Sequence, residues 1–251
     1  MIQGMSAGHT ADATAKTSLR LAGTARYGTG PGLTLAIWLG SLLIAGLLHA
    51  GSLDFTHLEQ IAGARYGPDA ARRVQGWKSV LERAAAEDER LQLRQINNFF
   101  NHNIRYMTDQ ELWGQKDFWA SPLETLGRAA GDCEDYAIAK YASLRKLGIP
   151  DSRLRLFYVH ARLGASASNA TEVHMVLGYY PTEAAEPLIL DNLISDIRPA
   201  SRRTDLKPVF SFNSQGLWAD GAAASAGDPH QPPRHHRHLS SYRSRCGRAV
   251  L

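Results

Sequence analysis

The segment GDCEDYAIAKY, residues 131–141, places one thiol among three carboxylates. Asp132 precedes Cys133, and Glu134 and Asp135 follow it. Negative neighbours raise the pKa of a thiol and so disfavour the thiolate, which is the form that attacks carbonyl carbons. A nucleophilic role for Cys133 therefore requires something that offsets the negative charge.

His174 and Asp191 are the residues best placed by the sequence to work with this thiol. They belong to two strand-like stretches, residues 173–181 and 186–192, which the turn-like residues 181–185 join. A hairpin centred on that turn pairs positions whose numbers sum to about 365, so it sets His174 opposite Asp191. Directly opposed residues have Cβ atoms ~4.5–5.5 Å apart, close enough for a carboxylate to accept a hydrogen bond from an imidazole.

A thiol, an imidazole and a carboxylate supply the nucleophile, the base and the orienting group of acyl transfer. In this hypothesis Cys133 gives its proton to His174, and Asp191 holds the imidazole in the correct tautomer. An oxyanion hole needs the backbone N–H of Cys133 and one more donor, for which the indole N–H of Trp119 is the candidate.

Each of these residues also has a purely structural interpretation. A cysteine in a helix is often a small buried hydrophobe, a histidine in an apolar strand belongs to the core, and an aspartate ends a strand. His160 competes with His174 as the base but has no carboxylate in an obvious partner position, and His102 is a weaker candidate still. The three types of residue in this order and spacing favour catalysis.

The three carboxylates beside Cys133 are too many for a helix cap alone. One acid in the first turn of a helix complements the helix dipole, and Asp132 suits the N-cap. Three acids within four positions oppose the thiolate, however, and a bound Ca²⁺ would neutralise them. Calcium bound by Asp132, Glu134 and Asp135 is thus compatible with the chemistry of these residues, although the segment lacks the spacing of an EF-hand.

Helices are predicted to carry the first half of the folded region and the nucleophile. Residues 57–104 show the periodicity of two or three amphipathic helices, and residues 105–126 read as a loop-rich stretch with two tryptophans. The segment 131–150 predicts a helix with Cys133 in its first turn and Gly148 at its end. Its buried stripe is predicted at Ala137, Ile138, Tyr141, Leu144 and Leu147, and its outward residues at Lys140, Arg145 and Lys146.

After this helix the pattern alternates with a period of two, which indicates β-strands. Helices followed by an antiparallel meander predict an α+β domain in which the N-terminal helices and the nucleophile helix pack on an antiparallel sheet. The predicted strands are residues 153–163, 173–181, 186–192 and 208–212.

The chain divides into three parts by composition. Residues 1–50 form a leader whose run Leu33–Leu48 holds 16 residues without a charge, which favours an exported protein with a cleaved signal peptide over a retained membrane anchor or a buried helix. Residues 55–218 form the folded domain, and residues 219–251 form a disordered basic tail rich in histidine. Membrane contact is expected only through the leader, if it is uncleaved.

Charge and cysteine content exclude two classes of protein. Much of the net charge of +4 comes from the tail, which has no aromatic ladder or binding motif beside it, so no nucleic-acid partner is expected. The chain has two cysteines, and the second, Cys246, lies in the tail, so a disulfide framework is not expected.

The segments quoted above resemble the bacterial transglutaminase-like cysteine proteinases. The likeness extends over about residues 55–218 and is carried by GDCEDYAIAKY, HMVLGYY, PLILDNL and RPASRRTDLKPVFSFNSQGLW, with NNFFN and DFWASPLE also fitting. It implies a papain/transglutaminase-like fold, a Cys133–His174–Asp191 triad, and calcium dependence through Asp132, Glu134 and Asp135.

The resemblance also implies a substrate, a partner and a compartment. Members of the family are periplasmic proteases that cut the N-terminal region of a large surface adhesin at a di-alanine site and so release cells from biofilm. An inner-membrane receptor for cyclic di-GMP sequesters the protease. The chain departs from the family pattern in its long leader, in the longer segment SASNATEV before His174, and in its basic tail.

Two alternative functions use the same residues. A transglutaminase or other acyltransferase would pass the acyl group from Cys133 to an amine instead of water. A non-catalytic calcium-binding module would act through a partner and would not need the thiol.

Overall fold

The computed structural model describes residues 53–162 and 171–219. The predicted leader, most of the SASNATEV segment and the tail beyond residue 219 lie outside the described residues. The elements below all belong to Asp54–Leu251, one of the two units into which the chain divides. Among these elements, no helix is both long enough and apolar enough to cross a membrane.

Three helices form the N-terminal part of the domain, as the periodicity predicts. Asp54 and Asp88 each accept a hydrogen bond from the backbone of the first turn that follows, which fixes where two of the helices begin. The apolar faces of the second and third helices bury Trp77, Ile96 and Phe100. The three helices are α2 (Phe55–Tyr66), α3 (Pro68–Ala84) and α4 (Glu89–Asn103).

The stretch predicted as loop-rich contains two short helices. The Thr108/Glu111 and Ser121/Glu124 capping boxes start them, a local signal that an apolar periodicity search does not detect. The connection also contains two residue pairs that form a parallel ladder and tie the end of α4 to the start of the nucleophile helix. These elements are β1 (Arg105–Tyr106), α5 (Asp109–Trp113), α6 (Pro122–Arg128) and β2 (Ala130–Gly131).

The predicted nucleophile helix is α7, Cys133–Lys146, and Cys133 is its first residue. Gly148 follows in the left-handed conformation with φ of 93°, as expected of a glycine that ends a helix. The prediction for Lys140 was wrong: its side chain is buried, with 1% relative exposure, and its ammonium lies over the Tyr136 ring. The helix is covered on both sides, because α4 and α6 pack on it as well as the sheet.

The sheet has six antiparallel strands in the order β6-β5-β4-β3-β7-β8. The α+β class predicted from the sequence is confirmed, and two short edge strands extend the sheet beyond the four that were predicted. The strands are β3 (Leu154–Arg162), β4 (Thr171–Tyr179), β5 (Leu188–Leu190), β6 (Arg198–Pro199), β7 (Leu206–Phe212) and β8 (Leu217–Ala219), with the 3₁₀ turns η1 (Asp151–Arg153) and η2 (Ala200–Arg202) between them.

The predicted register of the β4–β5 hairpin was wrong by two residues. Leu177 pairs with Leu190 and Tyr179 pairs with Leu188, so the paired numbers sum to 367. The ladder ends at Leu190, and Asp191 lies just beyond it rather than directly opposite His174. A shift of two residues keeps every side chain on its predicted face, because side chains alternate with a period of two.

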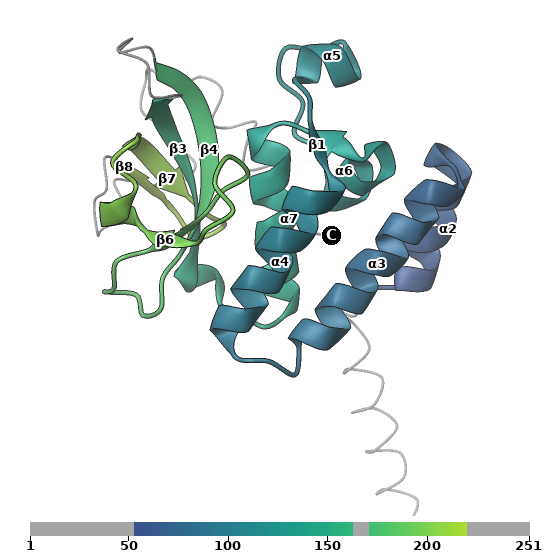
Figure 1. The fold of residues 1–251 in the computed structure, drawn as a ribbon, viewed down its shortest axis with the longest axis horizontal. Coiled ribbons are helices and arrows are strands. Elements are labelled where there is room, and N and C mark those ends of the chain that lie inside the picture. The colour runs from purple at the N-terminus through teal and green to yellow at the C-terminus, as the bar shows by residue number, and fades with distance from the viewer. Residues whose placement is uncertain (1–52, 163–170, 220–251) are drawn as a thin grey trace, which may run out of the picture. The chain divides into compact units, whose positions relative to one another are not determined.

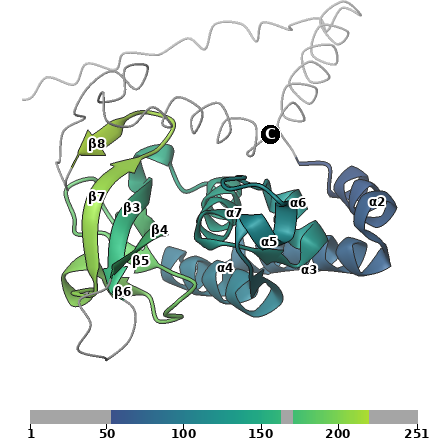
Figure 2. The same ribbon diagram turned by 90° about the horizontal axis from the view of Figure 1, so that it is seen from above.

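The helices lie on one side of the sheet in both views (Figures 1 and 2). Helix α7 packs against β4 and β3, α4 packs on α7, and α3 packs on α4. Trp77 of α3 donates a hydrogen bond of 2.8 Å to the Ser143 hydroxyl of α7. The nucleophile helix is therefore fixed between the N-terminal helices and the sheet.

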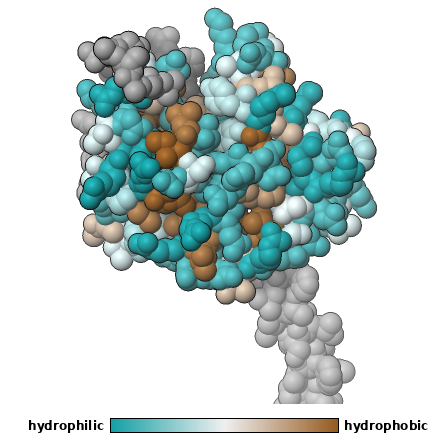
Figure 3. Space-filling view, in the orientation of Figure 1, coloured by the Kyte–Doolittle hydropathy of each residue, from teal (hydrophilic) through white to brown (hydrophobic). Residues whose placement is uncertain are grey.

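Hydrophilic side chains cover most of the face shown in Figure 3, and apolar ones gather where α4 meets the sheet. A hollow of about 560 Å³ lies there, and its lining includes the apolar residues Leu93, Leu188 and Ile197 and the arginines Arg90, Arg94 and Arg198. None of the site residues predicted from the sequence lines this hollow.

We expect Gly178→Ala to destabilise the domain by about 1–3 kcal/mol, since overpacking a core displaces its side chains. A Cβ at Gly178 of β4 would lie 2.4 Å from the ring of Phe157, which packs in a buried cluster on β3. Urea unfolding measures the change in the free energy of unfolding. The control is Gly63→Ala in α2, whose added Cβ meets Ala71 at 3.6 Å and should stabilise by up to about 1 kcal/mol. Equal stability of Gly178→Ala and the wild type would contradict the packing.

Candidate active site

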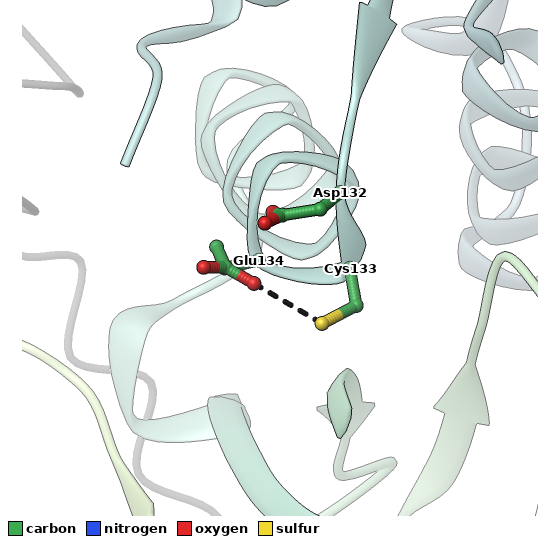
Figure 4. Close-up of side chains that lie close together, drawn as sticks. All are labelled: Asp132, Cys133 and Glu134. Atoms are coloured by element: carbon green, nitrogen blue, oxygen red, sulfur yellow. Dashed lines mark hydrogen bonds between the residues drawn. The ribbon is translucent and has the colours of Figure 1, made fainter. Parts of the chain in front are cut away.

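Cys133 occupies the N-terminus of α7, where its thiol lies beside the acids that flank it in sequence. Its sulfur donates a hydrogen bond of 3.1 Å to Oε2 of Glu134 (Figure 4). Asp132 stands at the N-cap, but its side chain makes no capping hydrogen bond. The carboxylate that could have capped the helix therefore stays beside the thiol.

The surroundings of Cys133 raise the pKa of its thiol well above the ordinary value. Burial is the largest cause, and the charges of Glu134 and Asp132 and the hydrogen bond to Glu134 act in the same direction. The backbone N–H of Met175 lowers the pKa but does not outweigh them. The structure therefore agrees with what the sequence indicated. While the neighbouring acids are charged and nothing offsets their charge, the thiolate of Cys133 is disfavoured.

The pKa values of the acids are raised as well, chiefly because the acids are buried. Burial, followed by the neighbouring carboxylates, raises the pKa of Asp132 to about 10. Burial also raises the pKa of Asp135 to about 8. Oδ1 of Asp132 and Oδ2 of Asp135 are buried without a hydrogen-bond partner, although a buried carboxylate oxygen ordinarily has one.

Two further acids, Asp109 and Asp117, complete the cluster, and the sequence analysis missed both. Ligand atoms of Asp109, Asp132 and Asp135 lie within 4.8 Å of one another, as do those of Asp109, Asp117 and Glu134. Clustered carboxylate oxygens, two of them buried without a partner, fit a hard cation such as Ca²⁺. The two missed acids lie in the loop-rich stretch before α7, where no local spacing marks them as ligands.

The acids also hold the loop that covers the start of α7. Oδ1 of Asp135 accepts a hydrogen bond of 2.7 Å from the backbone N–H of Ala120, and Oδ2 of Asp109 accepts one from the N–H of Phe118. A side chain at Gly131 would collide with Asp135, since a Cβ there would lie 2.7 Å from the carboxylate. The cluster is therefore built into the fold rather than scattered on the surface.

His174 and Asp191 form a buried hydrogen-bonded pair, with 2.8 Å between Nε2 and Oδ1. Burial alone would raise the pKa of Asp191, but the hydrogen bond and charge of His174, the N–H of Leu193 and Arg203 outweigh it and bring the pKa to about 2. An ionised carboxylate can only accept, so Nε2 of His174 carries the hydrogen. In the neutral ring Nδ1 is then the nitrogen that can take a proton.

Two interactions relate the nucleophile helix to this pair. The Cys133 sulfur faces the backbone N–H of Met175, the residue that follows His174 on β4. Seven residues after Cys133 on the same helix, the buried ammonium of Lys140 interacts electrostatically with the carboxylate of Asp191. The structure thus brings the thiol to the strand of the histidine, while the hydrogen bond that the thiol itself donates goes to Glu134.

Two asparagines of α4 hold the loop that carries Asp191. Asn101 donates to the backbone carbonyl of Asp191 at 2.8 Å, and Asn97 donates to that of Ser195 at 2.9 Å. The sequence analysis assigned neither asparagine a role. Their role depends on contacts between residues about ninety positions apart, which no local pattern shows.

The other candidates from the sequence take different places. The indole N–H of Trp119 donates to Asp117 at 2.9 Å, and the ring stacks near Phe212. Nδ1 of His102 bonds the carbonyl of Asn98 within α4. His160 lies on β3, where it pairs with Val173 in the ladder.

Two tyrosines beside the thiol were not predicted. Burial, followed by the charge of Cys133, raises the pKa of Tyr106 on β1 to about 12, and the same causes in the same order raise the pKa of Tyr158 on β3. Tyr106 remains 53% exposed. One aromatic side chain from the helical half and one from the sheet thus lie near the nucleophile.

Comparisons with known proteins agree on one family. The sequence pattern of the bacterial transglutaminase-like cysteine proteinases matches residues 69–216. The structure of Legionella pneumophila LapG is 34% identical, with a TM-score of 0.62, covering 80% of this chain and 99% of that one. The EGTA-treated form of that protein is 34% identical with a TM-score of 0.63, covering 78% of this chain and 100% of that one. The calcium-bound form is 35% identical with a TM-score of 0.60, covering 76% of this chain and 99% of that one. A search of curated protein sequences gives no match.

We expect Glu134→Gln to move the alkylation of Cys133 by iodoacetamide to lower pH in metal-free protein. Glu134 raises the pKa of the thiol by charge and by its hydrogen bond, so removing the charge increases the thiolate fraction at a given pH. The rate against pH is measured by mass spectrometry in a Cys246→Ser background. Glu183→Gln, in the exposed turn between β4 and β5, is the matched control. An unshifted profile for Glu134→Gln would contradict the electrostatic description of the thiol.

Proposed function

Because the chain belongs to the bacterial transglutaminase-like cysteine proteinase family, we propose that it is a calcium-dependent cysteine endopeptidase with Cys133, His174 and Asp191 as its catalytic triad. The observation that supports this most is that the thiol at the start of α7 faces the backbone N–H of Met175, the residue after His174 on β4, and that His174 is hydrogen-bonded to Asp191. This is the arrangement of nucleophile, base and orienting group that acyl transfer requires.

In the first half of the reaction, the Cys133 thiol gives its proton to Nδ1 of His174 and its sulfur bonds to the scissile carbonyl carbon. The C–N bond then breaks, a thioester forms, and the imidazolium gives the proton to the leaving amine. Asp191 stabilises the imidazolium without taking its proton, since its pKa is about 2. The backbone N–H of Cys133, at the N-terminus of α7, supports the oxyanion.

In the second half, water replaces the amine. His174 takes a proton from the water as the oxygen bonds to the thioester carbon, and the proton returns to the sulfur when the C–S bond breaks. The products are the carboxylic acid and the free thiol. The exposed Tyr106 and the neighbouring Tyr158 offer apolar surface to the peptide on either side of the cut.

Calcium is proposed to bind at Asp132, Glu134 and Asp135, with Asp109 and Asp117 as further ligands. The support is the donor set, all carboxylate, and the two buried oxygens without a partner. The solved structures of Legionella pneumophila LapG include calcium-bound and EGTA-treated forms. When bound, the ion would neutralise the carboxylates that, in addition to burial, raise the pKa of the thiol.

The family resemblance supplies the biological setting of this proposal. The substrate is the N-terminal region of a large surface adhesin, cut to release cells from biofilm, and the compartment is the periplasm. An inner-membrane receptor for cyclic di-GMP controls the enzyme by binding it. These assignments rest on the family and not on a contact in the structure.

We expect purified protein to cut an N-terminal fragment of a large adhesin from the same organism, and Cys133→Ala to abolish the cut. His174→Ala should reduce kcat/KM by at least about 10³-fold, because the triad residues act as a unit. Cleavage is followed by gel electrophoresis and mass spectrometry of the products. The control is His160→Ala, on the neighbouring strand, which should retain activity.

A primary amine added to the same reaction separates hydrolysis from acyl transfer. Hydrolysis leaves a free carboxylate at the new C-terminus, whereas an acyltransferase attaches the amine there. Cleavage that survives in Cys133→Ala would show that the thiol is not the nucleophile.

We expect Ca²⁺ to raise the melting temperature of the protein and EGTA to suppress cleavage. A ligand at 100 times its Kd stabilises the folded state by about 2.7 kcal/mol. The effect is followed by thermal unfolding and by calorimetric titration of Ca²⁺, with Mg²⁺ as the comparison ion because it needs a tighter octahedral site. The double variant Asp132→Asn/Glu134→Gln should lose the calcium response, and Glu183→Gln should keep it. Cleavage in excess EGTA would contradict the metal assignment.

A further inference from the structure

The carboxylate of Asp191 has a third partner besides His174 and the backbone. Oδ1 accepts from Nε2 of His174 at 2.8 Å and from the N–H of Leu193 at 3.0 Å. Oδ2 accepts from Nη2 of Arg203 at 2.7 Å. The side chains of Asp191 and Arg203 are both buried, with 0% and 1% relative exposure, so solvent screens this ion pair little.

Arg203 connects Asp191 to the end of β3 through Asp205. Its Nη2 and Nε also donate to Asp205, at 2.8 and 3.0 Å, and the carbonyl of Asp205 accepts from the N–H of Arg162 at the end of β3. A planar guanidinium can hold two carboxylates in fixed positions in this way, whereas an ammonium cannot. The orientation of the Asp191 carboxylate is therefore determined from both of its oxygens.

Stability alone is a poor explanation for this buried arginine. Burial would lower the pKa of Arg203, and its hydrogen bonds to Asp205 and Asp191 are needed to raise it. Even so, Nη1 is buried without a hydrogen-bond partner. A buried ion pair can often be replaced by apolar side chains without loss of stability, so the position of the charge is what calls for an explanation.

The charge of Arg203 bears directly on how the neighbouring imidazole holds its proton. The charged groups that face Asp191 are His174 from β4, Lys140 from α7 and Arg203, with Asp205 behind the arginine. The positive charge of Arg203 partly offsets the negative charge of the Asp191 carboxylate. The carboxylate therefore attracts a proton on His174 less strongly than it would without the arginine. Without Arg203, Asp191 would be a buried charge with less compensation, and the His174–Asp191 pair would bind its proton more tightly.

We propose that Arg203 is a positioning residue: it fixes the carboxylate of Asp191 and limits how tightly the His174–Asp191 pair binds its proton, so that the pair can both accept and release one. This inference rests on the proposed function, since it assigns Arg203 a part in the same acyl transfer. Two consequences follow, one for the titration of the imidazole and one for kcat.

The test compares Arg203→Met and Arg203→Lys with Arg202→Met in the full-length protein. Arg202 is the adjacent arginine, it lies in the turn η2, and its side chain is exposed, so it is the matched control. The imidazole of His174 is titrated by NMR, with its signal assigned by its loss in His174→Gln. The same variants are assayed for kcat and KM on the adhesin fragment between pH 5 and 9.

For Arg203→Met we expect the titration midpoint of the imidazole to rise by about one unit. The acid side of the kcat/KM profile should move to higher pH with it, and kcat should fall by about 10²-fold with little change in KM. Arg203→Lys keeps the positive charge but loses the planar guanidinium that binds both carboxylates. The titration midpoint of the imidazole in this variant should therefore stay near that of the wild type, while kcat falls by about ten-fold. Arg202→Met should match the wild type in all of these measurements.

An imidazole midpoint that does not move in a folded Arg203→Met variant would overturn the proposal and leave Arg203 a structural residue. If Arg203→Met does not fold, the test rests on Arg203→Lys alone. A kcat of Arg203→Lys equal to that of the wild type would then overturn the proposal. If the wild type cuts no adhesin fragment, the proposed function fails, but the NMR titration still tests the coupling between Arg203 and the imidazole.

Discussion

The packing of α7 against β4 is the constraint on which the candidate site depends. It places the first residue of the nucleophile helix next to the strand that carries His174, and it buries Lys140 near Asp191 two turns further along. Because α4 and α6 cover the rest of α7, the helix cannot slide along the strand. The relation of thiol to imidazole is therefore set by the core of the domain and not by loops.

The two sides of the site differ in how their charge is balanced. Around Cys133 the carboxylates outnumber the positive groups, and the pKa values of the thiol, Asp132 and Asp135 are all raised. Around Asp191 the charge is offset within the protein: the hydrogen bond and charge of His174, the N–H of Leu193 and the hydrogen bond from Arg203 outweigh burial and lower the pKa of the carboxyl to about 2. The first side is the one at which the proposed Ca²⁺ would bind.

Local patterns in the sequence predicted the longer helices and strands but not the short elements or the contacts between elements. The apolar period and Gly148 define α7, and the change to a period of two defines the strands. The hairpin register was missed because β5 is only three residues long and leaves Asp191 outside the ladder, yet an even shift preserved the face. Lys140, Arg203 and Asp109 could not be assigned because their burial and partners come from elements distant in the chain.

The hydrogen bonds from Asn97 and Asn101 to the Asp191 loop have a consequence for folding. They join a helix formed early in the chain to a segment about ninety residues later, and Arg203 adds a contact from later still. Such long-range contacts form only after the intervening elements have closed their loops. In a nascent chain that ends before Arg203, the carboxylate of Asp191 lacks its hydrogen bond to the arginine. The proposed peptidase activity would therefore arise only when nearly the whole domain has been synthesised and folded.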